Sequence, residues 1–129
     1  MAHVFLSDEW LAALAERGAA LPETPGVDLL VAHEIEGAPG GKVRFVIEWR
    51  DGRIVRAEAA KAPDADCVVQ AKAAEAKRVL AGEIAPEVAW MQGRLKIDGD
   101  YRAMLIDLRE WRHSEPYRAL WAEMAALTD

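Results

Sequence analysis

Histidine and cysteine are the residues of this sequence that could bind a metal ion or act in nucleophilic catalysis. His3, His33 and His113 lie in three separate stretches, and none has a second ligand at helix or strand spacing beside it. Because a zinc site needs several such ligands, we predict no metal site. Cys67 lies among Ala and Val residues, where a thiol usually behaves as a small inert hydrophobe. We therefore predict a structural or surface role for each histidine and an inert role for Cys67.

Two loops begin like ligand-binding motifs but do not complete them. Residues 98–100 (Asp-Gly-Asp) could open a calcium loop, but its twelfth position, where a glutamate binds the ion, is Arg109. The pair Gly41-Lys42 is typical of a phosphate-binding loop, yet Val43 replaces the hydroxyl residue that such a loop needs. We expect a hairpin turn there instead, and no cofactor is predicted.

The sequence is acidic, with 16 Lys and Arg against 22 Asp and Glu and a formal net charge of −6. This balance argues against nucleic acid as a partner, because neutralising phosphates needs a basic face. Residues 42–61 are the exception, since their six cations and three anions sum to +3. We expect this segment to meet anionic lipid headgroups or an acidic partner.

Three features favour a cytoplasmic protein. No apolar run approaches the ~18 residues of a membrane span. Asp8 and Glu9 interrupt the N-terminus where a signal peptide would continue its apolar stretch. Cys67 has no second cysteine with which to form an intrachain disulfide.

The chain has 129 residues, which is the size of one domain. We expect an N-terminal helix and loop at 1–26, with Ser7 as the helix N-cap, and strands within 27–71. Further helices and a last strand follow at 72–111, and a C-terminal helix occupies 112–129.

The strand pair around Asp51-Gly52 allows two registers. A two-residue turn would place Ile47 opposite Arg56, which is a poor pairing. A three-residue loop at 50–52 would instead pair Ile47 with Val55 and Phe45 with Ala57, and we predict this register.

Two amphipathic helices are expected at the end of the chain. The first carries apolar residues at helical spacing from Tyr101 to Trp111, and the second repeats that spacing from Tyr117 to Leu127. Periodicity alone leaves open whether these stripes are core or the adaptable wall of an apolar cavity. For the cavity interpretation, the candidate lining residues are Phe45, Ile47, Leu80, Trp90, Met91, Met104, Leu105, Leu108, Trp111, Leu120, Trp121 and Met124.

Three segments in the second half of the chain form an ordered set: 66–70 (DCVVQ), 78–82 (RVLAG) and 86–100 (PEVAWMQGRLKIDGD). The most specific part is the Ala-aromatic-Met-x-Gly-basic-Leu-Lys-Ile-x-Gly-Asp run at 89–100. The set resembles the C-terminal half of the sterol carrier protein type-two family, as a bacterial-like stand-alone domain.

This resemblance implies an α+β fold with a five-stranded, mostly antiparallel sheet covered by helices. It also implies an apolar tunnel or pocket between sheet and helices for sterols, fatty acyl chains or similar lipids. It implies no catalytic residues, so we expect that the protein is not an enzyme. The C-terminal helix would then cap the tunnel as a lid or fill it, and we favour the lid.

The leading function is therefore binding of a lipid or other hydrophobic small molecule of sterol, fatty acyl or isoprenoid type. The protein would then transfer this molecule or present it to an enzyme. The alternative is a non-catalytic interaction or accessory module with a collapsed pocket. Such a module would form a homodimer or dock an enzyme, for example in isoprenoid-lipid biosynthesis. Transient contact with a membrane or protein is expected in either case. A weaker third alternative is an enzyme that uses acid groups such as Asp98 and Asp100.

Overall fold

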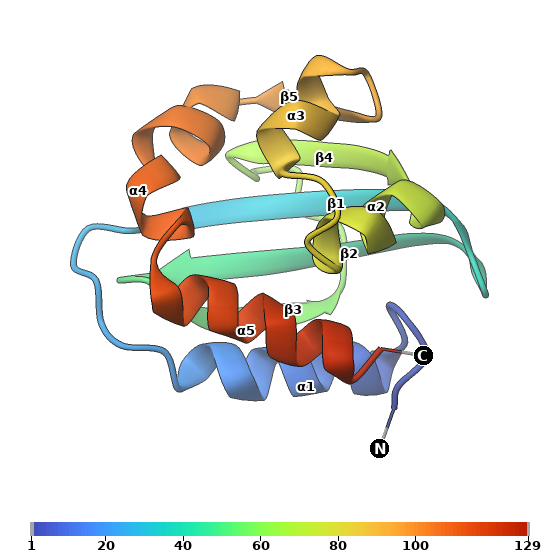
Figure 1. The fold of residues 1–129 in the computed structure, drawn as a ribbon, viewed down its shortest axis with the longest axis horizontal. Helices are drawn as coiled ribbons and strands as arrows, with labels where there is room; N and C mark the ends of the chain where they lie inside the picture. The colour runs from blue at the N-terminus through green and yellow to red at the C-terminus, as the bar shows by residue number, and fades with distance from the viewer. Residues whose placement is uncertain (1, 129) are drawn as a thin grey trace.

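The chain forms a sheet of five strands with helices arranged over one of its faces (Figure 1). The computed structural model describes residues 2–128, so the ends of the predicted domain, Met1 and Asp129, lie outside the described residues. The strands are β1 (Leu29–Ala38), β2 (Gly41–Arg50), β3 (Arg53–Ala59), β4 (Cys67–Lys72) and β5 (Leu95–Gly99). The helices are α1 (Asp8–Ala19), α2 (Ala73–Leu80), α3 (Pro86–Met91), the π-helix η1 (Ala103–Asp107), α4 (Arg109–Arg112) and α5 (Glu115–Ala126).

The strand order is β3-β2-β1-β4-β5. Three neighbouring pairs are antiparallel, and β1 with β4 is the parallel pair. This confirms the predicted α+β fold with a mostly antiparallel five-stranded sheet. Among the described residues, no helix is both long enough and apolar enough to cross a membrane.

The two faces of the sheet differ in polarity because side chains alternate along each strand. Toward the helices, Ile35, Phe45 and Ile47 are each at most 5% exposed. On the opposite face Glu34 lies 3.8 Å from Lys42 and 3.7 Å from Arg44. A hydrogen bond from the Gln70 amide (3.1 Å) holds the pKa of Glu34 below its usual value.

Ion pairs compensate the positive charge of residues 42–61. Besides the pairs to Glu34, the hairpin cations form four further pairs within 4 Å: Arg50 and Arg56 with Glu48, Arg56 with Glu58, and Arg53 with Glu23. The carboxylates of Glu34 and Glu23, which lie outside the segment, therefore offset part of its positive charge, while its cationic side chains stay partly exposed.

Helix α1 starts after Ser7, as predicted, and ends at Ala19. The Ser7 hydroxyl accepts a hydrogen bond from the Trp10 N–H at 3.2 Å, which caps the first turn. Gly18 allows the helix to approach β3, because a Cβ at this position would lie 2.5 Å from the Ile54 Cβ.

The predicted register of β2 and β3 is wrong. Asp51 (φ 50°) and Gly52 (φ 77°) form a two-residue turn with both residues left-handed, as a type I′ hairpin requires. A bulge then leaves Val55 unpaired and 57% exposed, so that Ile47 pairs with Ala57 rather than with Val55. Phe45 pairs with Ala59 in the same register.

The predicted α-helix from 101 to 111 is also wrong in its middle. Residues 103–107 form a π-helix, and Leu108 (φ −99°, ψ 12°) separates it from α4. The guanidinium of Arg112 donates to the carbonyls of Met104 (2.7 Å) and Leu105 (3.2 Å), which satisfies oxygens that the irregular turn leaves without an α-helical partner. The predicted second helix is confirmed as α5.

Candidate ligand-binding site

A cavity of about 1050 Å³ lies between the helix-facing side of the sheet and the helices. We call it the main cavity. Its floor is built by the alternating residues of four strands that point away from the ion-paired face, because a strand turns every second side chain to the same side. The floor residues are His33, Ile35, Phe45, Ile47, Val69, Ala71, Leu95 and Ile97.

The walls of the main cavity come from segments far apart in the sequence. Helix α2 and the loop after it line one side, α5 lines the other, and the N-terminal segment adds aromatic and aliphatic surface (Figure 1). The apolar wall residues include Phe5, Leu6, Trp10, Val79, Leu80, Met104 and Trp121. The volume lies just above the range of about 300–1,000 Å³ typical of small-molecule sites.

Charged and polar lining residues come from α3, α4, α5 and the α4–α5 junction. These residues are Glu87, Arg112, His113, Glu115 and Arg118, and we call them the polar rim. Arg112 is only 6% exposed and forms an ion pair with Glu87. The main cavity therefore combines an apolar floor with a polar rim, an arrangement suited to a molecule with an apolar body and a polar end.

His33 is the polar member of the floor. It lies on the central strand β1, and its ring stacks on Phe45 of β2 with centroids 4.5 Å apart and an interplanar angle of 1°. Burial lowers the pKa of His33 to about 4, so the imidazole is uncharged at neutral pH.

Tyr117 separates the main cavity from a second, smaller pocket, since it lines both. Its ring packs against Trp111 at 4.7 Å and Trp121 at 6.1 Å, and burial raises the pKa of its hydroxyl. Trp49 extends this aromatic cluster from β2, with its ring 4.9 Å from Trp111.

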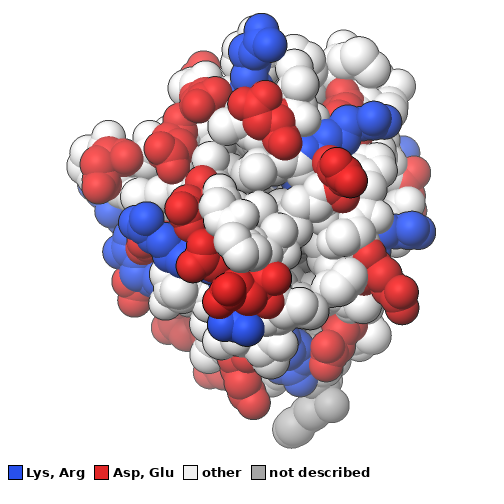
Figure 2. Space-filling view, turned by 90° about the vertical axis from the view of Figure 1, so that its left-hand side faces the viewer, with Lys and Arg blue, Asp and Glu red and all other residues white. Residues whose placement is uncertain are grey.

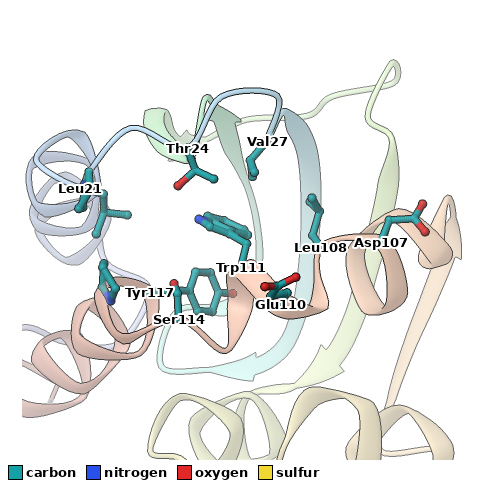
Figure 3. Close-up of a pocket in the computed structure, with 12 residues that line it drawn as sticks. Leu21, Thr24, Val27, Asp107, Leu108, Glu110, Trp111, Ser114 and Tyr117 are labelled. Carbon is teal, nitrogen blue, oxygen red and sulfur yellow. The ribbon is translucent and has the colours of Figure 1, made fainter.

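The smaller pocket has a volume of about 400 Å³, and we call it the side pocket. Figure 3 shows Trp111 in its middle, with Thr24 and Val27 from the loop after α1 on one side and Tyr117 on the other. This end of the molecule carries many acidic side chains around an uncharged central surface (Figure 2).

Five of the twelve residues proposed from sequence lie on the main cavity: Phe45, Ile47, Leu80, Met104 and Trp121. Three others are buried core residues outside its lining: Leu105 (3% exposed), Leu120 (3%) and Met124 (0%). The last two belong to α5, so this helix is part of the core as well as a cavity wall.

The remaining four candidates lie elsewhere. Leu108 and Trp111 line the side pocket, because the π-helix turns them away from Met104. Trp90 (36% exposed) and Met91 (71% exposed) lie on the surface, since the residue that α3 buries is Ala89.

Sequence reasoning missed most of the other lining residues, and His33 and Arg112 are two polar examples. His33 is not among the predicted lining residues, although its strand spacing with Ile35 places it on the apolar face. Arg112 had no such signal, because its burial depends on the π-helix.

No group of three or more His, Cys, Asp or Glu within residues 2–128 is arranged to hold a metal ion. Burial raises the pKa of the Cys67 thiol to about 11, and its sulfur lies 4.0 Å from that of Met104. The thiol is therefore protonated at neutral pH.

The arrangement of sheet, helices and cavity agrees with a family match. The model of the SCP-2 sterol transfer family matches residues 8–105. The chain belongs to this family. The match confirms the resemblance seen in the second half of the sequence and extends it to most of the chain. No curated protein matches the sequence.

Solved structures of the SCP-2 fold are similar to this chain along most of its length. A conserved hypothetical protein of Thermus thermophilus is 22% identical, with 97% of this chain and 93% of that chain covered and a TM-score of 0.67. A crystal structure of sterol carrier protein 2 is 20% identical, with 95% of each chain covered and a TM-score of 0.64. Palmitated sterol carrier protein 2-like 2 of Aedes aegypti is 18% identical, with 84% and 96% covered and a TM-score of 0.57. At these identities the likeness shows the fold.

Proposed function

We propose that this protein binds a lipid or other hydrophobic small molecule, of sterol, fatty acyl or isoprenoid type, in the main cavity, and that it transfers or presents this molecule. The observation that carries the proposal is the apolar cavity of about 1050 Å³ with its polar rim. Membership of the SCP-2 sterol transfer family supports it. The palmitated relative from Aedes aegypti supports an acyl chain as one ligand class.

Apolar burial alone is enough for useful affinity. Burying a chain of about 14 methylenes at about 0.8 kcal/mol each gains about 11 kcal/mol. Association and ordering remove about 4 kcal/mol or more. The remaining ~7 kcal/mol corresponds to a dissociation constant of about 10 µM, without any covalent chemistry.

Native mass spectrometry of freshly purified protein, followed by displacement of a fluorescent fatty acid, tests the proposal. Ala71 lies on the cavity floor, so Ala71→Phe should fill part of the cavity and weaken binding at least about tenfold. Lys72→Phe is the matched control, because the next residue of β4 is exposed and its side chain points to the other face. Absence of both retained lipid and saturable binding of sterols, acyl chains and isoprenoids would contradict the proposed function.

A second candidate is an accessory module that contacts a second copy or an enzyme partner through α3. It is favoured by the exposed apolar side chains of Val88, Trp90 and Met91, with Trp90 stacked on Tyr101 at 5.4 Å. Its collapsed-pocket form has no support, because the main cavity is not filled by side chains. Light scattering of the wild-type protein and of Met91→Lys tests self-association. A wild-type dimer that the substitution dissociates would support this candidate. A monomeric wild type would exclude the homodimer.

A further inference from the structure

His33 occupies the centre of an otherwise apolar floor. Its register partners are Phe45 on β2 and Val69 on β4, and Val31 and Ile35 are its neighbours on the same face of β1. All four are at most 6% exposed, whereas His33 is only half-buried and lines the main cavity. A molecule in the main cavity can therefore contact the imidazole of His33.

The His33 side chain has no hydrogen-bond partner within the described part of the chain, and its ring contact is the stack on Phe45. A neutral imidazole carries one N–H donor and one nitrogen acceptor. Desolvation by burial is the cause of the lowered pKa of His33, so the ring is uncharged at neutral pH.

Trp121 also lines the main cavity, but its indole nitrogen is buried beneath the surface of the lining and lies beside the Tyr117 hydroxyl. A ligand in the cavity therefore does not reach this N–H group, whereas it does reach the imidazole of His33.

The unpaired imidazole constrains what can fill the cavity. A saturated hydrocarbon over His33 would displace water and leave both imidazole nitrogens unpaired, which is unfavourable in an apolar site. A carboxylate or phosphate is disfavoured there, because the floor holds no cation and charge is costly to bury alone. A hydroxyl or carbonyl oxygen is uncharged and can pair with the imidazole.

We propose that the ligand of the main cavity carries an uncharged oxygen function, a hydroxyl or a carbonyl, on its apolar body, and that His33 selects it by hydrogen bonding. This inference rests on the proposed function, since it names the class of molecule that the same cavity takes. His33 acts as a specificity-determining residue, and any charged end of the ligand lies at the polar rim.

Matched probe pairs that differ in one oxygen test this inference. The pairs are stearic acid with 12-hydroxystearic acid, stearic acid with 12-oxostearic acid, and cholestene with cholesterol, each measured by displacement of a fluorescent fatty acid. We expect wild-type protein to bind the oxygenated member of at least one pair about tenfold more tightly, which corresponds to one additional hydrogen bond.

Three variants separate hydrogen bonding from packing. His33→Phe keeps a ring to stack on Phe45 but removes both nitrogens, so it should abolish the preference and strengthen binding of the unsubstituted member. His33→Asn keeps a donor and an acceptor and should retain part of the preference. Glu36→Gln is the matched control, because Glu36 is an exposed residue of the same strand whose side chain points to the opposite face, and it should leave the preference intact.

The ¹⁵N chemical shifts of the His33 ring give a second readout, which should move with 12-hydroxystearic acid and not with stearic acid. Equal binding within every pair that binds, as expected if an ordered water satisfies the imidazole, would overturn the inference and leave the proposed function standing. Failure of every probe to bind would overturn both.

Discussion

Arg112 on α4 pairs with Glu87 on α3, and this contact joins two sides of the polar rim. The Arg112 side chain is 4% exposed and also donates to the carbonyls of Met104 and Leu105. One guanidinium therefore ties α3, the π-helix and α4 together, and it does so at the edge of the main cavity.

Replacing this guanidinium by an apolar side chain should destabilise the fold. We expect Arg112→Met to lower the free energy of unfolding by about 3 kcal/mol, because it leaves Glu87 without its cation and two carbonyls without a donor. Urea denaturation followed by circular dichroism measures the change. Arg109→Met is the matched control, since Arg109 is an exposed residue of the same helix and should change stability by less than about 0.5 kcal/mol. Similar stabilities of the two variants would contradict the role assigned to Arg112.

Gly18→Ala should destabilise the protein although Ala is the better helix former. The substitution gains about 1 kcal/mol in helix propensity. The new Cβ would lie 2.5 Å from the Ile54 Cβ, and such overpacking against β3 costs about 1–3 kcal/mol. We expect a lower melting temperature for Gly18→Ala and little change for Gly40→Ala, because a Cβ at Gly40 meets nothing within 4 Å. A Gly18→Ala protein as stable as wild type would mean that α1 can move away from β3.

Elements whose signals are local were predictable from sequence. Ser7 and the apolar spacing after it predicted α1, and the alternation around Phe45 and Ile47 predicted which strand residues face the helices. The bulge at Val55 was not predictable, because the turn residues Asp51 and Gly52 suit more than one loop length.

The candidate site was predicted only in part, for a related reason. Helical periodicity places a residue on an apolar face but does not say whether core or cavity lies opposite, so Met124 and Trp121 of α5 could not be separated. The prediction that α5 is a lid rests on the same helical periodicity, which does not distinguish a lid from a core helix. With Leu120 and Met124 buried in the core, removal of this helix should unfold the domain rather than open a tunnel.

Cys67 should be unreactive in the folded protein. Burial first, and then the charges of Asp66 and Asp100, raise the pKa of its thiol from 9.0 to about 11. This shift lowers the thiolate fraction near pH 8 about a hundredfold, and the side chain is also shielded, being 1% exposed. Reaction with a disulfide reagent should therefore be at least about a hundredfold slower than in urea-unfolded protein. Rapid modification under native conditions would show that β4 opens locally.

The stability of the protein should fall with acid through His33. Its pKa is about 4 in the folded state against 6.5 for the free side chain, so the unfolded state binds the proton more tightly. Stability is then complete above pH 6.5 and is lost as the pH falls from 6.5 toward 4. A difference of about 2.5 pKa units corresponds to about 3 kcal/mol.

His33→Phe removes this titration. The free energy of unfolding of both proteins is measured by urea denaturation at pH 7.5 and at pH 4.5. Between these two pH values the wild type should lose about 2–3 kcal/mol more stability than the variant. The other titratable groups that line the main cavity, Glu87, His113, Glu115 and Tyr117, are present in both proteins and cancel in the comparison. Parallel pH profiles of the two proteins would show that His33 is hydrated in the folded state, and that the floor of the main cavity is wetter than its apolar neighbours indicate.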